Sequence, residues 1–559
     1  MDYQYALNEG ASHLNDFQKD VIEECIRKGW GGLSLPMGSG KTLISLIVAL
    51  SQSIKYNTKE PILVVATKSL IVSWETEIKK FFGDKLKYEI FYKNPEIFKI
   101  KEDTIILLTT PETLSKCYKH NHINNKFVDE DLVNVGAFDY YNREINIDSF
   151  RHPINPFLDT LGDGLSYVYS TRFSSFIVDE VQKFTNIETT RCRSIGSICS
   201  TTRWVLSGTM FDEPKLERIL GYYIIIDHPT FPRNLVDARN EITNINFKGL
   251  SKTLVKRDKN TEINIPPKLN KIIISHNLSV EESVVYLTMK KTLHTLKEYV
   301  KRLRLGGTDA DRVKRFSSYL LAMVTYLRQG LVCPLIPVAN ITLDMADHDN
   351  KSDLSTILQS EFNKAGIEEW MNNTDSIKST RIKKVLETLD KHNDEKVVMF
   401  TCFRTSVNVI NYFINDRKVL MLTPNMSIAK RGKIIEEFQS EEGKNTILFL
   451  TYELGAEGLN LQCSHTVLII DFWWNSGKTS QAIARVLRFG QMSDTVNVYF
   501  FTGNTGIEKA LFTKQQDKLT ILGELENGPL KSTVKKMTID SVLKIIELGD
   551  NVDSLTNIN

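Results

Sequence analysis

The segment SLPMGSGKT, residues 34 to 42, constrains the fold of this chain more than any other feature. A short apolar run, Trp30 to Leu35, precedes it, and the following TLISLIVAL repeats apolar residues at helical spacing. This order predicts a strand, a glycine turn and a helix. Gly38 and Gly40 would let the backbone wind its N–H groups toward an anion, and the positive end of the helix would add to the attraction. The sequence therefore predicts a phosphate-binding loop in an α/β fold.

Two side chains at the end of this loop carry nucleotide chemistry. Lys41 would reach the β- and γ-phosphates of ATP, and the Thr42 hydroxyl would take a place on Mg²⁺. The general pattern GxxxxGK[ST] has a glycine where this chain has Leu35, so an ordinary flexible turn is the alternative interpretation. We predict ATP and Mg²⁺ as cofactors. The loop would contribute these nucleotide-binding residues: Met37, Gly38, Ser39, Gly40, Lys41 and Thr42.

A second candidate site lies in the segment SSFIVDEVQ. The apolar run Phe176 to Val178 ends in Asp179 and Glu180, which places two carboxylates at the carboxyl end of a buried parallel strand, where ligands bind in such sheets. Asp179 would hold Mg²⁺, and Glu180 would orient and help deprotonate the attacking water. A surface turn with two solvated acids is the alternative, and the apolar residues directly before the pair disfavour it.

The C-terminal half has the pattern of a second α/β layer. Strand-like apolar runs alternate with helical segments, which indicates another doubly wound parallel sheet. In QAIARVLRFGQ, Arg485 and Arg488 lie three positions apart, so they would share one helical face and could reach a phosphate across a cleft as arginine fingers. A basic helix face solvated by water is the alternative. The strand-like runs lie in KVVMFTCF (396–403), NTILFLTYELGAEGLNL (445–461), HTVLIIDFWWN (465–475) and VNVYFFT (496–502).

Composition limits the class of protein. With 559 residues, 42% of them hydrophobic, the chain is long enough for at least two domains. The formal net charge is only +2, so a nucleic-acid surface must come from local clustering of basic residues. The seven cysteines form no CxxC pair or zinc-like group, which indicates a reducing compartment. Without a secretory leader or an apolar stretch of about 20 residues, we expect an intracellular protein, in the nucleus or, if viral, at a cytoplasmic replication site or in the virion.

Further segments resemble the superfamily-two helicase core, and more narrowly the Swi/Snf-type DNA-dependent ATPases. Gln18 in HLNDFQKDVI resembles the glutamine that reads adenine upstream of the phosphate loop. The resemblance keeps the order of the family motifs and covers roughly residues 14 to 270 and 380 to 505. The other matching segments are PILVVATKSLIVSWETEIKKF (61–81), ILLTTPETL (106–114), LSGTMF (206–211), LVKR (254–257), PPK (266–268), GAEGLNL (455–461), DFWWN (471–475) and QAIARVLRFGQ (481–491).

This resemblance implies an α/β fold of two RecA-like, doubly wound parallel-sheet lobes with a helical insertion between them. The expected parts are an ATP-binding lobe (1–235, with an insertion at about 120–172), a linker and helical protrusion region (236–375), a second lobe (376–525) and a tail (526–559).

The resemblance also implies roles for individual residues. Gly458 would join the nucleotide site. Hydrolysis would be coupled to movement by Gln182, Ser207, Gly208, Thr209 and Gln481. The nucleic-acid backbone would contact Ser69, Thr109, Thr110 and Thr451, for which ordinary strand-end capping is the alternative.

The chain departs from the family pattern in the segment after the two acids. Where a histidine usually follows D-E-A, this chain reads DEVQ, with Val181 and Gln182. Because that position usually links the hydrolytic site to the S-G-T segment, coupling is expected to be tuned differently. Thr67 and Glu457 also differ from the usual residues, but no departure removes a catalytic group.

The function implied is an ATP-hydrolysing motor that is stimulated by double-stranded DNA and translocates without necessarily separating strands. A strand-separating DNA or RNA helicase acting in transcription is one alternative, and a nucleotide-switched nucleic-acid-binding scaffold is another. Expected partners are nucleic acid, with transcription, chromatin or virion proteins, and no membrane. The basic segment from Lys290 to Arg315 could hold duplex DNA, or could be a solvated amphipathic helix.

Overall fold

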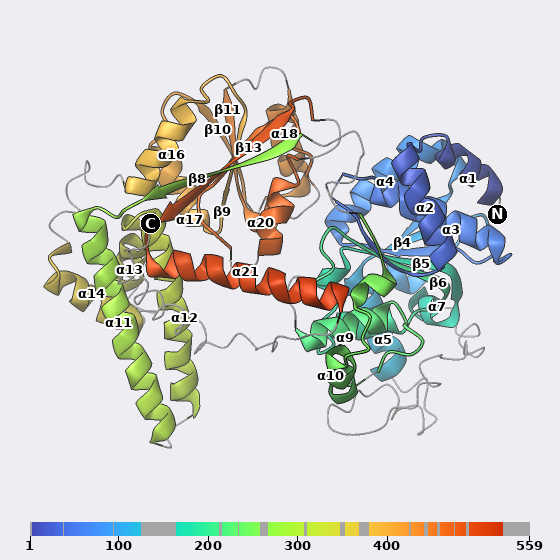
Figure 1. Ribbon diagram of the computed structural model, residues 1–559, viewed down its shortest axis with the longest axis horizontal. Helices are drawn as coiled ribbons and strands as arrows, with labels where there is room; N and C mark the ends of the chain where they lie inside the picture. Colours follow the sequence, from blue (N-terminus) through green and yellow to red (C-terminus); the bar gives the residue numbers. More distant parts are fainter. Residues whose placement is uncertain are drawn as a thin grey trace. The chain divides into compact units, whose positions relative to one another are not determined.

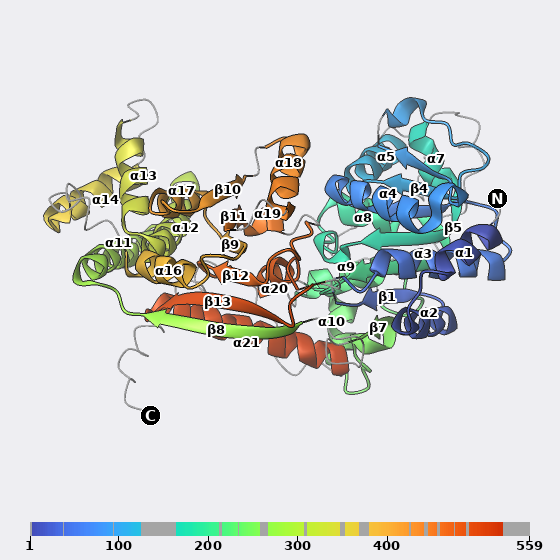
Figure 2. The same ribbon diagram turned by 90° about the horizontal axis from the view of Figure 1, so that it is seen from above.

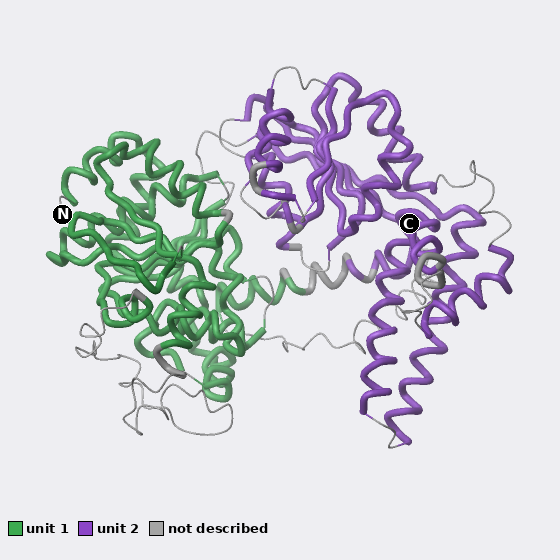
Figure 3. Tube along the Cα trace, turned by 180° about the vertical axis from the view of Figure 1, so that it is seen from behind, with its two compact units in different colours: residues 1–265, 517–535 green, residues 266–516, 536–559 purple. Residues whose placement is uncertain are grey.

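A computed structural model gives the structure of the chain (Figure 1). It divides into two compact units (Figure 3), unit 1 with residues 1–265 and 517–535 and unit 2 with residues 266–516 and 536–559. The first boundary falls inside the region expected to be a linker. The described residues are 3–36, 38–92, 94–123, 164–211, 215–232, 234–257, 267–306, 310–346, 353–367, 379–423, 426–440, 445–455, 459–473, 476–487 and 491–528. The expected insertion at 120–172 and the tail after 528 lie mostly outside them.

Unit 1 is built around a seven-stranded sheet with the order β3-β4-β2-β5-β6-β1-β7. Every neighbouring pair is parallel, which confirms the parallel sheet expected for the first lobe. β2 and β4 are buried at every position, as their continuous apolar sequences predict. The strands are β1 (Gly31–Ser34), β2 (Ile62–Val65), β3 (Tyr88–Phe91), β4 (Ile106–Thr109), β5 (Arg172–Asp179), β6 (Cys199–Ser207) and β7 (Leu254–Lys256).

Helices cover both faces of this sheet (Figure 2). In β2, Leu63 and Val65 belong to one hydrophobic cluster, whereas Ile62 and Val64 belong to the other, because successive strand side chains point to opposite faces. The helices are α1 (Tyr3–Ala11), α2 (Asp16–Lys28), α3 (Lys41–Lys55), α4 (Lys68–Phe82), α5 (Pro111–Ile123), α7 (Gly164–Ser170), α8 (Thr190–Gly196), α9 (Leu216–Ile225) and α10 (Leu235–Thr243).

Unit 2 contains a six-stranded sheet with the order β10-β11-β9-β12-β13-β8. All neighbouring pairs are again parallel, which confirms the expected second sheet. The edge strand β8 lies in the expected linker region and was not predicted as a strand; its neighbour β13 pairs with it along nine residues. The strands are β8 (Lys268–His276), β9 (Val397–Thr401), β10 (Lys418–Leu422), β11 (Thr446–Thr451), β12 (Thr466–Ile469) and β13 (Thr495–Gly503).

The helical insertion of unit 2 begins with two long helices, α11 (Val280–Leu305) and α12 (Ala310–Val332). They share a hydrophobic cluster that includes Met289 and Met323, and most basic side chains between Lys290 and Arg315 are exposed. Among the helices that the structure describes, none is long and apolar enough to cross a membrane. The other helices of this unit are α13 (Leu335–Ala346), α14 (Asp353–Lys364), α16 (Thr380–Asp390), α17 (Arg404–Tyr412), α18 (Ile428–Gln439), α19 (Tyr452–Gly455) and α20 (Ser476–Ile483).

The last helix, α21 (Gly506–Asn527), contributes to both units. Near its start, Ile507 and Leu511 belong to the hydrophobic cluster of α11 and α12. Near its end, Leu525 belongs to a cluster of unit 1, and Glu526 forms an ion pair of 2.6 Å with Lys256. The residues 517–525, expected in the second lobe, therefore lie in unit 1.

A buried ion pair joins three elements of unit 2. Arg381 of α16 is 0% exposed and lies 2.6 Å from the Glu508 carboxylate of α21. The Arg381 Nε also donates to Nε2 of His276, at the end of β8, over 3.4 Å. Burial, together with the adjacent Arg381 charge, lowers the pKa of His276 to about 3. The imidazole is therefore neutral at ordinary pH.

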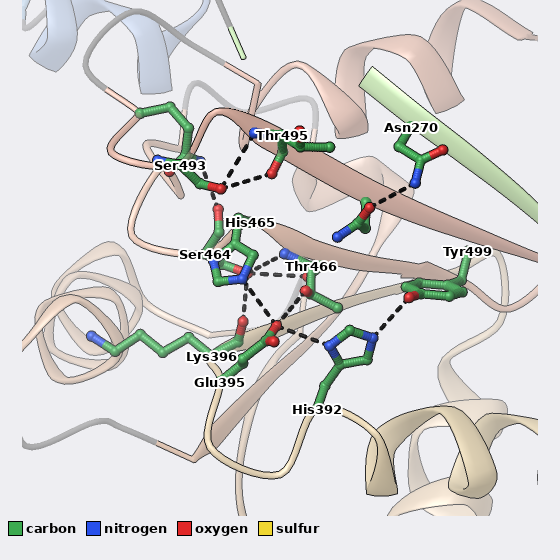
Figure 4. A network of polar contacts seen from close by, with 12 residues as sticks. Asn270, His392, Glu395, Lys396, Ser464, His465, Thr466, Ser493, Thr495 and Tyr499 are labelled. Atoms are coloured by element: carbon green, nitrogen blue, oxygen red, sulfur yellow. Dashed lines mark hydrogen bonds and ion pairs between the residues drawn. The ribbon is translucent and has the colours of Figure 1, made fainter. Parts of the chain in front are cut away.

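A polar network lies at the amino ends of β9, β12 and β13 (Figure 4). The Oε2 atom of Glu395 lies 3.0 Å from His392 and 3.1 Å from His465, and it accepts a hydrogen bond of 2.6 Å from Thr466. The other ring nitrogen of His392 lies 2.8 Å from the Tyr499 hydroxyl. Burial acts to raise the pKa of Glu395, but these donors outweigh it and the pKa lies below its usual value.

Candidate nucleotide site

The phosphate-binding loop connects β1 to α3, as predicted. Gly38 and Gly40 both have φ of +82°, the left-handed region that glycine tolerates. A Cβ atom on Gly40 would lie 2.3 Å from Nε2 of Gln18, and that nitrogen donates to the Ser39 carbonyl over 3.2 Å. Gln18, on α2, is thus held directly against the loop. Met37 lies outside the described residues.

Lys41 and Thr42 begin α3, so the helix starts at the loop. The Lys41 ammonium donates to the carbonyls of Leu35 and Pro36 over 3.1 and 3.2 Å, and it therefore lies within the curve of the loop. The Ser39 hydroxyl is buried without a hydrogen-bond partner among the described residues. Such an unpaired polar atom is expected where a loop is shaped to bind a polar ligand.

The predicted acid pair follows the central strand β5, which is separated from β1 by β6. Asp179 is the last residue of β5, and its two carboxylate oxygens accept from the Glu180 backbone N–H and from the Trp74 indole N–H, each over 2.9 Å. Burial and the Glu180 charge raise the pKa of Asp179 to about 6, while the Trp74 hydrogen bond and the Lys41 charge oppose the rise.

Glu180 is held in an unusual conformation. Its φ is +53° and it is 6% exposed; a residue other than glycine adopts this region rarely, and often at functional sites. The Gln182 side-chain amide donates to the Glu180 carboxylate, and its own carbonyl oxygen is buried without a partner in the described part of the chain. Gln182, predicted to couple hydrolysis to movement, therefore also positions the predicted catalytic base.

The S-G-T segment, residues 207–209, follows β6 at the same carboxyl edge of the sheet as the loop and the acid pair. In the strand register Asp179 pairs with Leu206, and Ser34 pairs with Ser207, so the loop, the acid pair and residues 207–209 follow three adjacent strands. The Ser207 hydroxyl donates to the Thr209 carbonyl over 2.6 Å and accepts from its N–H over 2.9 Å. The Thr209 hydroxyl is buried and unpaired within the described residues. Gly208 lies between Ser207 and Thr209 in the sequence.

The residues predicted to contact nucleic acid differ in whether their hydroxyl groups are already hydrogen-bonded within the protein. The Thr109 hydroxyl donates to the Phe91 carbonyl over 2.7 Å, and Thr110 shares a hydrogen bond of 2.9 Å with Thr113. These internal bonds favour the alternative of strand-end capping for both side chains. Thr451 ends β11 in unit 2 with a buried, unpaired hydroxyl among the described residues. Ser69 lies on α4, but its side chain is not described.

In unit 2, Arg485 lies just beyond the end of α20, and the predicted helical face shared with Arg488 stays a prediction because Arg488 is not among the described residues. α20 ends at Ile483, residues 484–486 form turns, and the Arg485 N–H donates to the Ala482 carbonyl over 3.1 Å. The Arg485 side chain is 2% exposed, and Gln481 on α20 is 8% exposed. Arg488 and Gly458 lie outside the described residues.

Two features of the site were missed from the sequence. Trp74 was assigned only to a nucleic-acid segment, although a buried indole N–H needs an acceptor and here finds Asp179. Arg257 of the LVKR segment forms ion pairs of 2.7 Å with both Asp20 and Glu24 of α2. The spacing of Asp20 and Glu24, four residues apart on one helical face, was the available signal for a basic partner.

A phosphate loop and an acid pair at the carboxyl edge of one parallel sheet, on strands β1 and β5 with β6 between them, define a P-loop nucleoside triphosphatase. The family model for the SNF2-related domain matches residues 28–333, more than half of the chain, and that for the helicase conserved C-terminal domain matches residues 378–490. The chain belongs to the SNF2-related family, within the helicase superfamily, and is an ATP hydrolase.

Individual relatives are distant. "Putative helicase 172L" of Invertebrate iridescent virus 6 is 24% identical over 84% of this chain and 82% of its own length. "DNA repair and recombination protein RAD54" of Saccharomyces cerevisiae is 22% identical over 66% of this chain, and "Uncharacterized ATP-dependent helicase MG018" of Mycoplasma genitalium is 22% identical over 97%. The chain spans 42% and 45% of those two relatives.

Among solved structures, the chain is similar to the "Sulfolobus solfataricus SWI2/SNF2 ATPase core in complex with dsDNA". It is 20% identical and matches 92% of this chain and 94% of its own, with a TM-score of 0.36.

Proposed function

We propose that this ATPase is a Mg²⁺-dependent motor that is stimulated by double-stranded DNA and translocates along it without necessarily separating strands. The observation that carries the proposal is the convergence of the phosphate loop, the acid pair and the S-G-T segment on three adjacent strand ends of one sheet. A site of this composition supports hydrolysis, and the attached S-G-T segment offers a route by which hydrolysis can be linked to movement.

The donor atoms fit Mg²⁺, which prefers oxygen ligands. Thr42 supplies a hydroxyl in the first turn of α3, and Asp179 supplies a carboxylate whose two hydrogen-bond donors leave further lone pairs available. When bound, the ion would neutralise charge on the phosphate oxygens. Lys41 would bind the phosphates, and Glu180, oriented by Gln182, would accept a proton from the attacking water.

Duplex DNA as the stimulating nucleic acid is supported by the motif forms DFWWN and RFGQ in the second lobe, which resemble the Swi/Snf type. The relative named for DNA repair and recombination adds support, since it matches 66% of this chain. Hydroxyl and main-chain contacts to a phosphodiester backbone carry little sequence information, which suits a motor that moves along DNA of any sequence.

ATP hydrolysis measured without nucleic acid and with duplex DNA, single-stranded DNA or RNA tests the proposal. We expect duplex DNA to give the largest stimulation, and Glu180→Gln to reduce turnover by at least about 100-fold because a general base is lost. Glu188→Gln, which removes an exposed acid from the same loop, is the matched control and should keep wild-type turnover.

The outcomes separate the alternatives. Strongest stimulation by RNA or single-stranded DNA, together with strand displacement, would favour the strand-separating helicase. Equal rates in all conditions, with or without nucleic acid, would favour the nucleotide-switched scaffold and contradict the motor.

A further inference from the structure

Trp74 is the largest side chain that contacts the acid pair. It lies on α4, is 1% exposed, and belongs to the hydrophobic cluster that α3 and α4 form with β2. An indole has one polar hydrogen and no acceptor, so a buried indole needs an acceptor oxygen in a fixed position. In this protein that oxygen is Oδ2 of Asp179, 2.9 Å away.

The geometry at Asp179 is that of a carboxylate held at both oxygens. Oδ2 accepts from Trp74 and Oδ1 accepts from the Glu180 backbone N–H, each over 2.9 Å. Two donors on different oxygens fix the plane of the carboxylate and hence both of its side-chain torsions. Each oxygen keeps a second lone pair, so the donors orient the group without blocking it.

The fold makes this donor rigid. β2 pairs directly with β5, with Val65 opposite Val178, so α4, which follows β2, starts next to the strand end that carries Asp179. The indole is packed among Leu70, Ile71 and Ile78 of its own helix in the same cluster. The nitrogen therefore reaches Asp179 from a packed helix, not from a mobile loop.

We propose that Trp74 is a positioning residue for the Mg²⁺ site, whose indole N–H holds the Asp179 carboxylate in the orientation that receives the hydrated ion. This inference rests on the proposed role of Asp179 at Mg²⁺. It assigns the α4 segment, which resembles a nucleic-acid-contacting segment, a second function at the nucleotide.

A second tryptophan of the same cluster provides a matched comparison. Trp204 on β6 is also 1% exposed, and its indole N–H donates to Oε1 of Gln52 over 2.9 Å. Its acceptor is a neutral amide away from the acid pair, so this hydrogen bond satisfies a buried indole and does nothing for the site. Trp74→Phe and Trp204→Phe each remove one indole N–H from one hydrophobic cluster.

The test measures binding of a fluorescent ADP analogue to the full chain with Mg²⁺ and with EDTA. The readout is the ratio of the two affinities, which a general loss of packing would not change. We expect Trp74→Phe to reduce the ratio about 10-fold, the usual size of effect for a group that orients a metal ligand, with the affinity in EDTA unchanged. Trp204→Phe should keep the wild-type ratio.

A double-mutant cycle separates positioning from packing. With Asp179→Asn, the charged carboxylate is absent and the ratio is already reduced, so adding Trp74→Phe should change it by less than about 2-fold. An unchanged ratio in Trp74→Phe, an equal fall in Trp204→Phe, or a full additional fall in the double variant would overturn the inference. If the wild-type protein itself bound the analogue equally well in Mg²⁺ and EDTA, the proposed metal site would fail first, and the role of Trp74 with it.

Discussion

The carboxyl ends of the strands in unit 1 and the amino ends of the strands in unit 2 differ in how their polar side chains are hydrogen-bonded. At the first, Ser39, Gln182 and Thr209 each keep a buried polar atom without a partner among the described residues. At the second, one oxygen of Glu395 is contacted by two histidines and a threonine. Unpaired polar atoms cost stability, so those beside the phosphate loop and the acid pair are explained if a ligand uses them, whereas the Glu395 carboxylate finds its partners within the fold.

The largest effect should come from breaking the buried pair of unit 2. Arg381→Leu leaves the Glu508 carboxylate, which is 5% exposed, without its cationic partner, and should lower the free energy of unfolding by about 3–5 kcal/mol. Hydrogen exchange of the β8 and β13 amides measures the loss. The double variant Arg381→Leu, Glu508→Gln should recover part of it, and a loss below about 1 kcal/mol would show that the pair is weakly coupled to the fold.

Gln182→Ala tests whether a polar side chain at the carboxyl edge of unit 1 contributes to turnover and not to stability. Loss of a hydrogen bond to a charged group is worth about 1.5–3 kcal/mol, so turnover should fall about 10- to 100-fold, while thermal stability is kept because an unpaired buried oxygen is removed as well. Gln52→Ala is the control, since the Gln52 side chain bonds Trp204 and the Gly29 carbonyl and, among the described residues, neither acid of the pair. That variant should lose stability and keep turnover. The reverse pattern would contradict the comparison.

A pH titration of stability should report His276. Its pKa in the folded protein is about 3, below the ordinary value of about 6.5, so the unfolded chain binds a proton in this interval and the folded chain does not. Stability is therefore full above pH 6.5 and falls by up to about 1.4 kcal/mol per pH unit as the pH drops toward 3. The charged groups around the ring are Arg381, its partner Glu508, and Lys384.

His276→Asn should flatten the pH dependence of the unfolding free energy between pH 6.5 and 4.5. His294→Asn, which replaces an exposed histidine of α11, is the control and should leave the curve as in the wild-type protein. A slope that persists in His276→Asn would assign the acid sensitivity to other groups.

The smallest effect is expected at the amino edge of unit 2. Glu395→Gln removes a partly exposed charge from a network whose other members can still bond to one another or to water, so the loss should stay below about 1 kcal/mol. Thermal unfolding measures the change, and ATP turnover should not alter. A loss of turnover comparable to that of Gln182→Ala would mean that this edge also takes part in function.

Much of the site was predictable because its residues are close in sequence. Gly38, Gly40, Lys41 and Thr42 share one turn, and Asp179 and Glu180 follow one apolar strand, so local spacing was sufficient. The strand β8 was harder to recognise, because as an edge strand its sequence KLNKIIISH alternates weakly between polar and apolar residues. The end of α20 at Ile483 was also hard to predict, because local propensity defines helix boundaries poorly.

The amino-acid sequence by itself determined the two parallel sheets, the phosphate loop and the identity of the acids, since these depend on periodic burial and on short glycine-rich turns. Only the tertiary structure decided which side chains from distant parts of the sequence contact Asp179 and the acidic residues of α2. Trp74 lies 105 residues before Asp179, and Arg257 lies more than 230 residues after its partners on α2. A hydrogen bond joins atoms in space, and no local pattern records which distant strand or helix the fold will bring alongside.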